Sequence, residues 1–359
     1  MSRFLNERYA GFSAYTPGEQ PANKKYIKLN TNESPYPPGD KVLRALDRSV
    51  LGDLKLYPDP EQKYLRNALA SSVSGVALTR ENIFVSNGSD DILNFAFASF
   101  AGGSEKAVFP DISYGFYEVF AKFYGIRCER IPLKDDFTLC ADDYMLGNRG
   151  LIVIANPNAP TGLTVSTGDI ERIAEANPDS VVLVDEAYVD FGAESAVTAV
   201  RDHENLLVVR TYSKSYSLAG ARLGWAIGSH SLISDLELMK YSTNPYSINR
   251  MTEAAGLAAL EEKDYYRANC ERIIATREKT KKELMALGFD VTKSEANFLF
   301  ARSDHVRGAE LYSDLKSRGI LVRWFDNSRI NDHVRITIGT PEDMDELITA
   351  VKDILNGGI

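Results

Sequence analysis

The sequence predicts an α/β protein with three parts: a large domain whose mostly parallel sheet has helices on both faces in α/β/α layers, a smaller α+β domain and an N-terminal arm. Short continuous apolar runs alternate with amphipathic helical patterns between residues 83 and 227, as is typical of parallel strands buried on both faces. A long helical region then leads to a second, shorter set of strands and helices. We place the arm at 1–40, the large domain at 41–248 and the small domain, packed with the arm, at 249–359.

The composition and charge of the chain argue against several classes of function. The chain has 359 residues, 44% of them hydrophobic and 25% charged, which is ordinary for a globular protein with two cores. A net charge of -9 argues against nucleic acid or an anionic membrane as the main partner. The first residues lack an apolar signal core, and nowhere do eighteen apolar residues run together.

The cysteines and histidines indicate neither disulfides nor a metal. Three widely spaced cysteines form no CxxC pair, and four scattered histidines form no HExxH motif or triad. We therefore expect a reduced, cytoplasmic protein without a metal site.

The arm and the region after it are punctuated by proline and glycine. Residues 11–40 contain too many of them for a long helix or a central strand. Within the arm, Asn32 lies in a polar stretch that either lines a cleft or forms a solvated turn. Helices are predicted at 41–51 and 61–72, with Tyr57 in the Pro-bounded loop between them.

The remaining elements follow from hydrophobic periodicity. In the large domain, strands are predicted at 83–85, 107–109, 151–154, 181–184, 206–209 and 223–227, and helices at 91–100, 116–124 and 168–176. In the small domain, we expect helices at 249–287 with a break near 263, at 308–317 and at 342–355, and strands at 298–300, 320–324 and 334–338. In the last strand Arg335 points away from the apolar face, toward solvent or a cleft.

Polar residues follow the predicted strands at their carboxyl ends, where ligands of parallel sheets gather. A helix N-terminus, an amide, an acid, a phenol and a lysine would therefore meet in one crevice. These residues are Gly88, Ser89 and Asp90, then Asn158, then Asp185 and Tyr188, then Thr211, Ser213 and Lys214.

Together these residues suit an aldehyde cofactor that carries a pyridine ring. Lys214 alone would be a surface lysine in a Ser-rich loop, but a buried lysine can lose its proton and attack a carbonyl. Asp185 would pair with the pyridine nitrogen and keep it protonated. Asn158 and Tyr188 would donate to the ring oxygen beside the aldehyde.

A phosphate on that cofactor would also find its partners. The amides of Gly88, Ser89 and Asp90 at a helix start would bind it, helped by Ser213 and Arg222, provided that the carboxylates of Asp90 and Asp91 point away. Tyr114 would stack on the ring. Taken singly, these residues fit caps, turns and core aromatics, whereas their placement at successive strand ends favours a cofactor site.

Three motifs resemble the fold-type I pyridoxal-phosphate aminotransferases: NPNAPTG at 156–162, DEAYVDF at 185–191 and SKSYSLAGARLG at 213–224. More narrowly, YTPGEQP at 15–21, LNTNESPYPP at 29–38 and YPD at 57–59 resemble the histidinol-phosphate aminotransferase family. The likeness runs from about residue 12 to the end. The chain departs from the usual motifs at Ser34, at 89–91, at Ser215 and at Ser217.

The resemblance implies pyridoxal 5'-phosphate as cofactor and a homodimer with shared active sites, in which Tyr57 reaches the cofactor phosphate of the neighbouring subunit. It implies that Arg335 binds an α-carboxylate, and that Arg323 and Tyr15 bind the phosphate of histidinol phosphate, with Asn32 among the substrate-binding residues.

The leading hypothesis is amino transfer between glutamate and imidazole-acetol phosphate in a ping-pong cycle, as part of histidine biosynthesis. The partners would be a small-molecule amino donor and a 2-oxo acid acceptor. The nearest alternatives are a broad aromatic aminotransferase and an amino-acid-phosphate decarboxylase. A non-enzymatic sensor that retains the cofactor would need an appended domain, for which the two predicted domains leave no residues.

Overall fold

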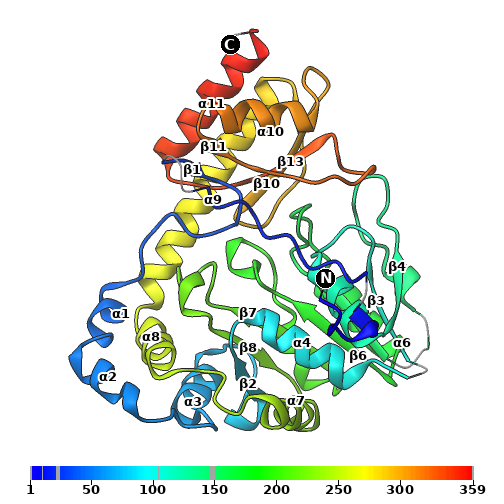
Figure 1. The fold of residues 1–359 in the computed structure, drawn as a ribbon, viewed down its shortest axis with the longest axis vertical. Coiled ribbons are helices and arrows are strands. Elements are labelled where there is room, and N and C mark those ends of the chain that lie inside the picture. The colour runs from blue at the N-terminus through cyan, green and yellow to red at the C-terminus, as the bar shows by residue number, and fades with distance from the viewer. Residues whose placement is uncertain are drawn as a thin grey trace.

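A seven-stranded sheet forms the centre of the lower half of the molecule (Figure 1). The structure is a computed structural model that describes residues 2–9, 11–21, 25–103, 105–145, 147 and 150–357, so residues 1, 10 and 22–24 of the predicted arm lie outside it. The strand order is β2 (Ile83–Ser86), β8 (Gly224–Ile227), β7 (Leu206–Thr211), β6 (Ser180–Asp185), β5 (Gly150–Ala155), β3 (Lys106–Pro110) and β4 (Arg127–Ile131). Only β8 runs antiparallel to its neighbours, so the prediction of a mostly parallel sheet is confirmed.

Alternate side chains of the central strands enter two separate cores, because successive residues of a strand point to opposite faces. In β5, Ile152 and Ile154 enter one core, while Leu151 and Val153 enter the other. The first core is covered by α3 (Lys63–Ser72), α6 (Thr167–Ala176) and α8 (Arg250–Leu260). The second is covered by α4 (Ser89–Phe100), α5 (Phe116–Tyr124) and α7 (His230–Thr243). These layers give the expected α/β/α arrangement.

A four-stranded antiparallel sheet lies in the upper half of the molecule (Figure 1). Its order is β12 (Arg323–Trp324), β13 (His333–Thr337), β10 (Phe298–Ser303) and β9 (Phe289–Val291), and its core includes side chains of α9 (Lys263–Ala286), α10 (Gly308–Ser317) and α11 (Pro341–Leu355). The arm joins this half of the molecule, because β1 (Ile27–Lys28) pairs in parallel with β11 (Ile320–Leu321). The proposed domain limits at 40 and 248 stay a prediction.

Several predicted elements need correction. The helix expected at 41–51 is two helices, α1 (Asp40–Ala45) and α2 (Arg48–Gly52), because Asp47 accepts hydrogen bonds from the amides of Ser49 (2.8 Å) and Val50 (3.2 Å) and starts a new helix. The strand expected at 320–324 divides into β11 and β12, which pair with different strands. Helix α7 and strands β1, β4 and β9 were not predicted from the sequence.

Short 3-10 turns complete the element list: η1 (Glu7–Tyr9), η2 (Asp53–Lys55), η3 (Arg80–Asn82), η4 (Ala141–Tyr144), η5 (Val189–Phe191), η6 (Ala196–Arg201) and η7 (Ala219–Ala221). Within the described part of the chain, no helix combines the length and the apolar character needed to cross a membrane.

The arm passes between the two sheets, as the dark blue trace in Figure 1 shows. Strands β5 and β6 end side by side, with Ala155 opposite Asp185, and Asp185 in turn lies opposite Val209 of β7. The polar residues that follow these strands therefore share one edge of the sheet, next to the arm.

Candidate active site

Lys214 lies in the loop after β7, with its amine against the arm. Its Nζ donates a hydrogen bond to the carbonyl oxygen of Thr31 (3.2 Å) and lies 5.8 Å from the centre of the Tyr188 ring. Burial of the amine, aided by the nearby charge of Arg335, lowers the pKa of Lys214 to about 8, although Glu33 and Asp90 act in the opposite direction. About a tenth of the amine is therefore uncharged at pH 7, and this uncharged form is the one that can act as a nucleophile.

Asp185 ends β6 and is 6% exposed. Its carboxylate accepts hydrogen bonds from the hydroxyl of Tyr117 (2.8 Å) and the amide of Ala187 (3.3 Å). Burial raises the pKa of Asp185 to about 6, against the effect of the Tyr117 hydrogen bond. The group is thus mainly ionised at pH 7, and its hydrogen-bond partners in the described structure include no cation.

The start of α4 forms a cradle of backbone amides. Gly88 precedes the helix at φ +84°, and no side chain of the described residues caps the first turn. Uncapped amides at a helix N-terminus suit an anion such as phosphate. Ser213 lies close to this edge, its hydroxyl accepting a hydrogen bond from Thr211 (2.9 Å).

Two positions here favour glycine. At Gly88 the positive φ strains any other residue, and the end of the Arg222 side chain, 2.5 Å from an added Cβ, would have to move. A Cβ on Gly224 would lie 2.4 Å from the backbone of Gly88 and Ser89. These glycines let β8 and Arg222 come against the start of α4.

The carboxylate of Asp90 does not point away as the sequence analysis expected. Arg222, in the left-handed region at φ +54°, extends over Gly88, and its Nη2 lies 3.2 Å from Asp90 Oδ2. Asp90 also accepts a hydrogen bond from Tyr114 (2.8 Å). The prediction holds for Asp91, which turns back to the Ser86 hydroxyl and the Asn87 amide.

Asn158 and Tyr188 are both held by fixed hydrogen bonds. The Asn158 amide donates to the carbonyl of Ile112 (3.1 Å) and the hydroxyl of Thr161 (3.0 Å). The Tyr188 hydroxyl accepts from Asn32 Nδ2 (2.9 Å). Of the two alternatives for Asn32, the cleft is correct, since this residue is 1% exposed.

The aromatic residues lie at one end of the crevice. Tyr15 stacks on Phe116 at 4.2 Å between ring centres, and Tyr114 lies 6.2 Å from Tyr15 in an edge contact. The Tyr114 ring also makes an edge contact with Tyr117, which holds Asp185. The tyrosines thus link the arm to the acid at the end of β6.

Arg335 points into the cleft rather than to solvent. Its Nη2 donates to the Asn30 carbonyl (3.0 Å), while its buried Nε has no hydrogen-bond partner in the described structure. A buried, unpaired guanidinium N–H suits an incoming carboxylate. Arg323 lies opposite Arg335 on the neighbouring strand and donates to the carbonyls of Thr16 (3.1 Å) and Pro17 (3.3 Å), next to Tyr15.

Tyr57 lies away from these residues on the surface. It is 77% exposed and stacks on Tyr246 at 4.5 Å, and its carbonyl accepts a hydrogen bond from Arg250. Within one subunit the structure does not bring Tyr57 to Lys214.

Sequence reasoning missed several residues of the crevice. Tyr117 was not predicted as a site residue because its place in the hydrophobic pattern of α5 is that of a core aromatic. The carbonyls of Asn30 and Thr31 carry no side-chain signal at all. Thr337 donates to Asn32 Oδ1 (2.9 Å), and its alternation with Arg335 in β13 was the one available hint.

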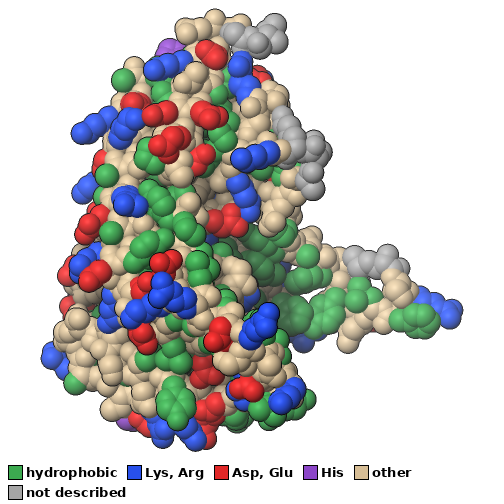
Figure 2. Space-filling view, turned by 90° about the vertical axis from the view of Figure 1, so that its left-hand side faces the viewer, with side chains coloured by type: hydrophobic (Ala, Val, Ile, Leu, Met, Phe, Trp, Pro, Cys, Tyr) green, Lys and Arg blue, Asp and Glu red, His purple; other side chains and the backbone are tan. Residues whose placement is uncertain are grey.

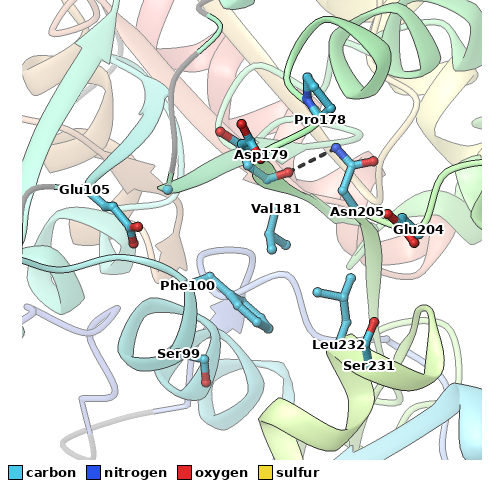
Figure 3. Close-up of a pocket in the computed structure, with 12 residues that line it drawn as sticks. Ser99, Phe100, Glu105, Pro178, Asp179, Val181, Glu204, Asn205, Ser231 and Leu232 are labelled. Carbon is cyan, nitrogen blue, oxygen red and sulfur yellow. Dashed lines mark hydrogen bonds between the residues drawn. The ribbon is translucent and has the colours of Figure 1, made fainter.

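A cavity of about 360 Å³ lies elsewhere, at the amino ends of the strands. Figure 3 shows Asp179, Val181 and Asn205 around it, with Asn205 donating to the Ser180 carbonyl (3.0 Å). Because it lies at the edge of the sheet opposite Lys214, and the described residues that line it include no Lys or Arg, it is no candidate for this chemistry. Among the described residues, no group of three or more His, Cys, Asp or Glu could hold a metal ion.

Comparisons with known proteins agree with this arrangement. Residues 24–351 match the family "Aminotransferase class I and II". The chain is 46% identical over 356 residues to the histidinol-phosphate aminotransferase of Clostridium beijerinckii, covering 99% of this chain and 98% of the relative. It is 48% identical over 356 residues to that of a Marinomonas species, covering 99% and 100%.

A solved structure shares the fold. The histidinol-phosphate aminotransferase of Sinorhizobium meliloti, in complex with pyridoxal-5'-phosphate, superposes with a TM-score of 0.88 at 24% identity, covering 99% of this chain and 98% of that one.

Fold and crevice together define an aminotransferase of the fold-type I class. Within that class, the chain belongs to the histidinol-phosphate aminotransferase family.

We expect the Lys214 amine of the cofactor-free protein to react with an aldehyde reagent at a rate that rises about tenfold per pH unit and levels off above about pH 8, because only the uncharged amine attacks. Rapid-mixing absorbance measurements over roughly pH 6–10, a range that brackets the pKa of Lys214, test this prediction. Glu33→Gln should move the midpoint downward, since Glu33 stabilises the ammonium. A midpoint at the ordinary lysine value would contradict the assignment.

We expect Asp185→Asn to stabilise the cofactor-free protein at pH 7 by about 1–3 kcal/mol while strongly slowing turnover of the complete enzyme. The folded-state pKa of Asp185 is raised, so its ionised form costs stability at neutral pH; that cost starts to fall as pH drops below about 6 and is lost only near the ordinary Asp pKa of about 4. Denaturant unfolding at pH 7 and near pH 5 measures the difference, which should shrink at the lower pH. A variant less stable than the parent at pH 7 would mean that the carboxylate acts as a structural cap.

Proposed function

We propose that this protein transfers the amino group between L-histidinol phosphate and 2-oxoglutarate, giving imidazole-acetol phosphate and L-glutamate, in histidine biosynthesis. The observation that carries the proposal is the pair formed by Arg323 and Arg335, which face each other across two strands beside Lys214 and Tyr15. The relatives named above support the same reaction.

The residues present fit pyridoxal 5'-phosphate. When bound, this cofactor supplies an aldehyde for a lysine and a ring that takes up electrons from the substrate carbon. The uncapped amides of α4, with Ser213 and Arg222, would hold its phosphate, which then competes with Asp90 for Arg222. Asp185, ionised at pH 7 and oriented by Tyr117, would meet the ring nitrogen.

Lys214 is the group that would move the proton. Its Nζ can take a proton from the substrate carbon and return it one position further along, because a pKa of about 8 lets it exchange protons near neutral pH. The Thr31 carbonyl and the Tyr188 ring orient the amine. Asn158 and Tyr188 would bind the ring oxygen, with Asn32 fixing the Tyr188 hydroxyl.

The two arginines would bind different substrate groups. The unpaired Nε of Arg335 would take the α-carboxylate of glutamate. Arg323 and Tyr15 would take the phosphate of histidinol phosphate, and in the other half-reaction the side-chain carboxylate of glutamate. One site can thus serve both substrates in turn.

We further propose a homodimer with shared active sites. A row of exposed apolar side chains precedes Tyr57, on the side of the molecule that Figure 2 faces, where hydrophobic side chains lie among charged ones. The row consists of Leu43, Leu46, Leu51, Leu54 and Leu56. Such a surface suits a second copy of the chain, which would bring Tyr57 to the neighbouring cofactor phosphate. The three free cysteines fit a cytoplasmic enzyme.

A broad aromatic aminotransferase is the second candidate, favoured by the stacked Tyr15 and Phe116 next to Tyr114. The two candidates differ in whether Arg323 matters for substrates without a phosphate.

We expect Arg323→Ala to lower kcat/KM for histidinol phosphate by about tenfold to a hundredfold and to affect phenylalanine much less, since a charge-assisted hydrogen bond contributes roughly 1.5–3 kcal/mol. Arg335→Ala should instead impair glutamate and phenylalanine and relatively spare histidinol phosphate. Steady-state assays with each substrate measure this. Arg302→Ala is the matched control, because Arg302 pairs with surface acids of the same sheet. Equal losses for histidinol phosphate and phenylalanine in Arg323→Ala would favour the aromatic aminotransferase.

We expect inactive Lys214→Ala subunits mixed with impaired Tyr57→Ala subunits to regain activity, because one site of each hybrid dimer has both residues intact. Subunit exchange is followed independently, by native mass spectrometry of the mixture. Exchange without recovered activity would place Tyr57 outside the partner's site.

A further inference from the structure

Arg323 and Arg335 lie next to each other on neighbouring strands, where their positive charges repel. Strands β12 and β13 are antiparallel, and these two residues are direct cross-strand partners. Side chains of such partners share one face of the sheet with their Cβ atoms about 5 Å apart, and like charges placed there repel. Something in the structure must therefore hold the two guanidinium groups in place.

Backbone carbonyls of the arm account for part of this. Arg335 donates to Asn30, and Arg323 donates to Thr16 and Pro17. These carbonyls fix the outer ends of the guanidinium groups, but each arginine uses different acceptors. None of these carbonyls contacts both groups.

Phe325 is placed to do so. Its ring centre lies 5.5 Å from the Arg323 guanidinium carbon and 5.7 Å from that of Arg335. Both distances are within the range in which a cation is attracted to an aromatic ring. One ring thus contacts both cations.

An apolar cluster fixes the position of the Phe325 ring. Phe325 packs against an apolar cluster formed by Ile112, Leu133, Phe300 and Ile330. Ile112 and Leu133 belong to the half of the molecule with the seven-stranded sheet, while Phe300 lies in β10. The Phe325 ring therefore cannot shift without moving residues from both halves of the molecule.

We propose that Phe325 is a specificity-determining positioning residue, which sets the separation of the two guanidinium groups and hence the length of the two-anion substrate that the site accepts. The inference rests on the proposed function only in taking Arg335 and Arg323 as the two anion-binding groups. A substrate or inhibitor with anions at both ends must match this separation, because the same ring contacts both arginines.

The test uses Phe325→Leu and Phe325→Tyr in the complete enzyme. Leucine keeps the apolar contact with the cluster and removes the ring, whereas tyrosine keeps the ring and is the matched control. Inhibition constants are measured for succinate, glutarate and adipate, which differ only in the spacing of their carboxylates. The cofactor absorbance and kcat verify that the site is otherwise intact.

We expect the parent to discriminate among the three diacids by roughly tenfold or more, and Phe325→Leu to reduce this ratio by about twofold to fivefold, the factor for losing one cation–π contact at a partly exposed site. KM for glutamate should rise with kcat nearly unchanged. Phe325→Tyr should keep the parental ratio.

A uniform weakening of all three diacids in Phe325→Leu, with the ratio unchanged, would overturn the inference and leave Phe325 a packing residue. A parent that does not discriminate among the diacids would overturn it as well. Failure of the parent to use histidinol phosphate, together with length selectivity that Phe325→Leu removes, would reject the proposed substrate and support the role of Phe325.

Discussion

Positive charge buried beside the arm is the constraint on which the rest of this crevice depends. Lys214 and Arg335 are buried there, with the partly exposed Arg323 beside Arg335, and burying a cation costs free energy unless it has an acceptor. The acceptors are mostly backbone carbonyls of the arm, namely those of Thr16, Pro17, Asn30 and Thr31. Carbonyls orient the cations without neutralising them, so the site keeps its attraction for an anionic substrate. A carboxylate in each of these places would have cancelled that attraction.

The arm can serve in this way because it is held at both ends of its polar stretch. Before the stretch, Ile27 pairs with Ile320 in a short parallel ladder. Within it, Asn32 adopts φ +56°; its backbone amide donates to the Thr337 hydroxyl, and that hydroxyl donates to Asn32 Oδ1. The carbonyl of Asn32 also accepts from Asn297 (3.0 Å). The arm is therefore a fixed wall of the crevice, and the proline residues that exclude regular structure leave its carbonyls free to bind side chains.

The sequence predicted the parts of the fold and site that depend on local pattern. Apolar runs located the buried strands, and the strand-end rule brought Asp185 and Lys214 to one edge. It missed β4, an edge strand whose exposed, charged residues give no apolar run, and α7, although Ser229 caps that helix. Contacts that depend on strand register or on an unusual backbone conformation could not be predicted from the sequence. Arg323 lies opposite Arg335 only because β12 pairs with β13 in that alignment. Asp90 contacts Arg222 only because of the backbone conformation of Arg222.

The residues at two departures from the family motifs contact each other. Ser34 in the arm replaces the more usual Asn, and Ser217 in the Lys214 loop replaces a small apolar residue or Gly, yet the Ser217 hydroxyl donates to that of Ser34 (2.9 Å). Ser217 adopts φ +55°, a conformation that costs a non-glycine residue about 1–2 kcal/mol. One hydrogen bond contributes about 1 kcal/mol, which offsets part of that cost only when both serines are present. The two changes therefore act together to join the arm to the loop that carries Lys214, and neither touches the anion-binding arginines.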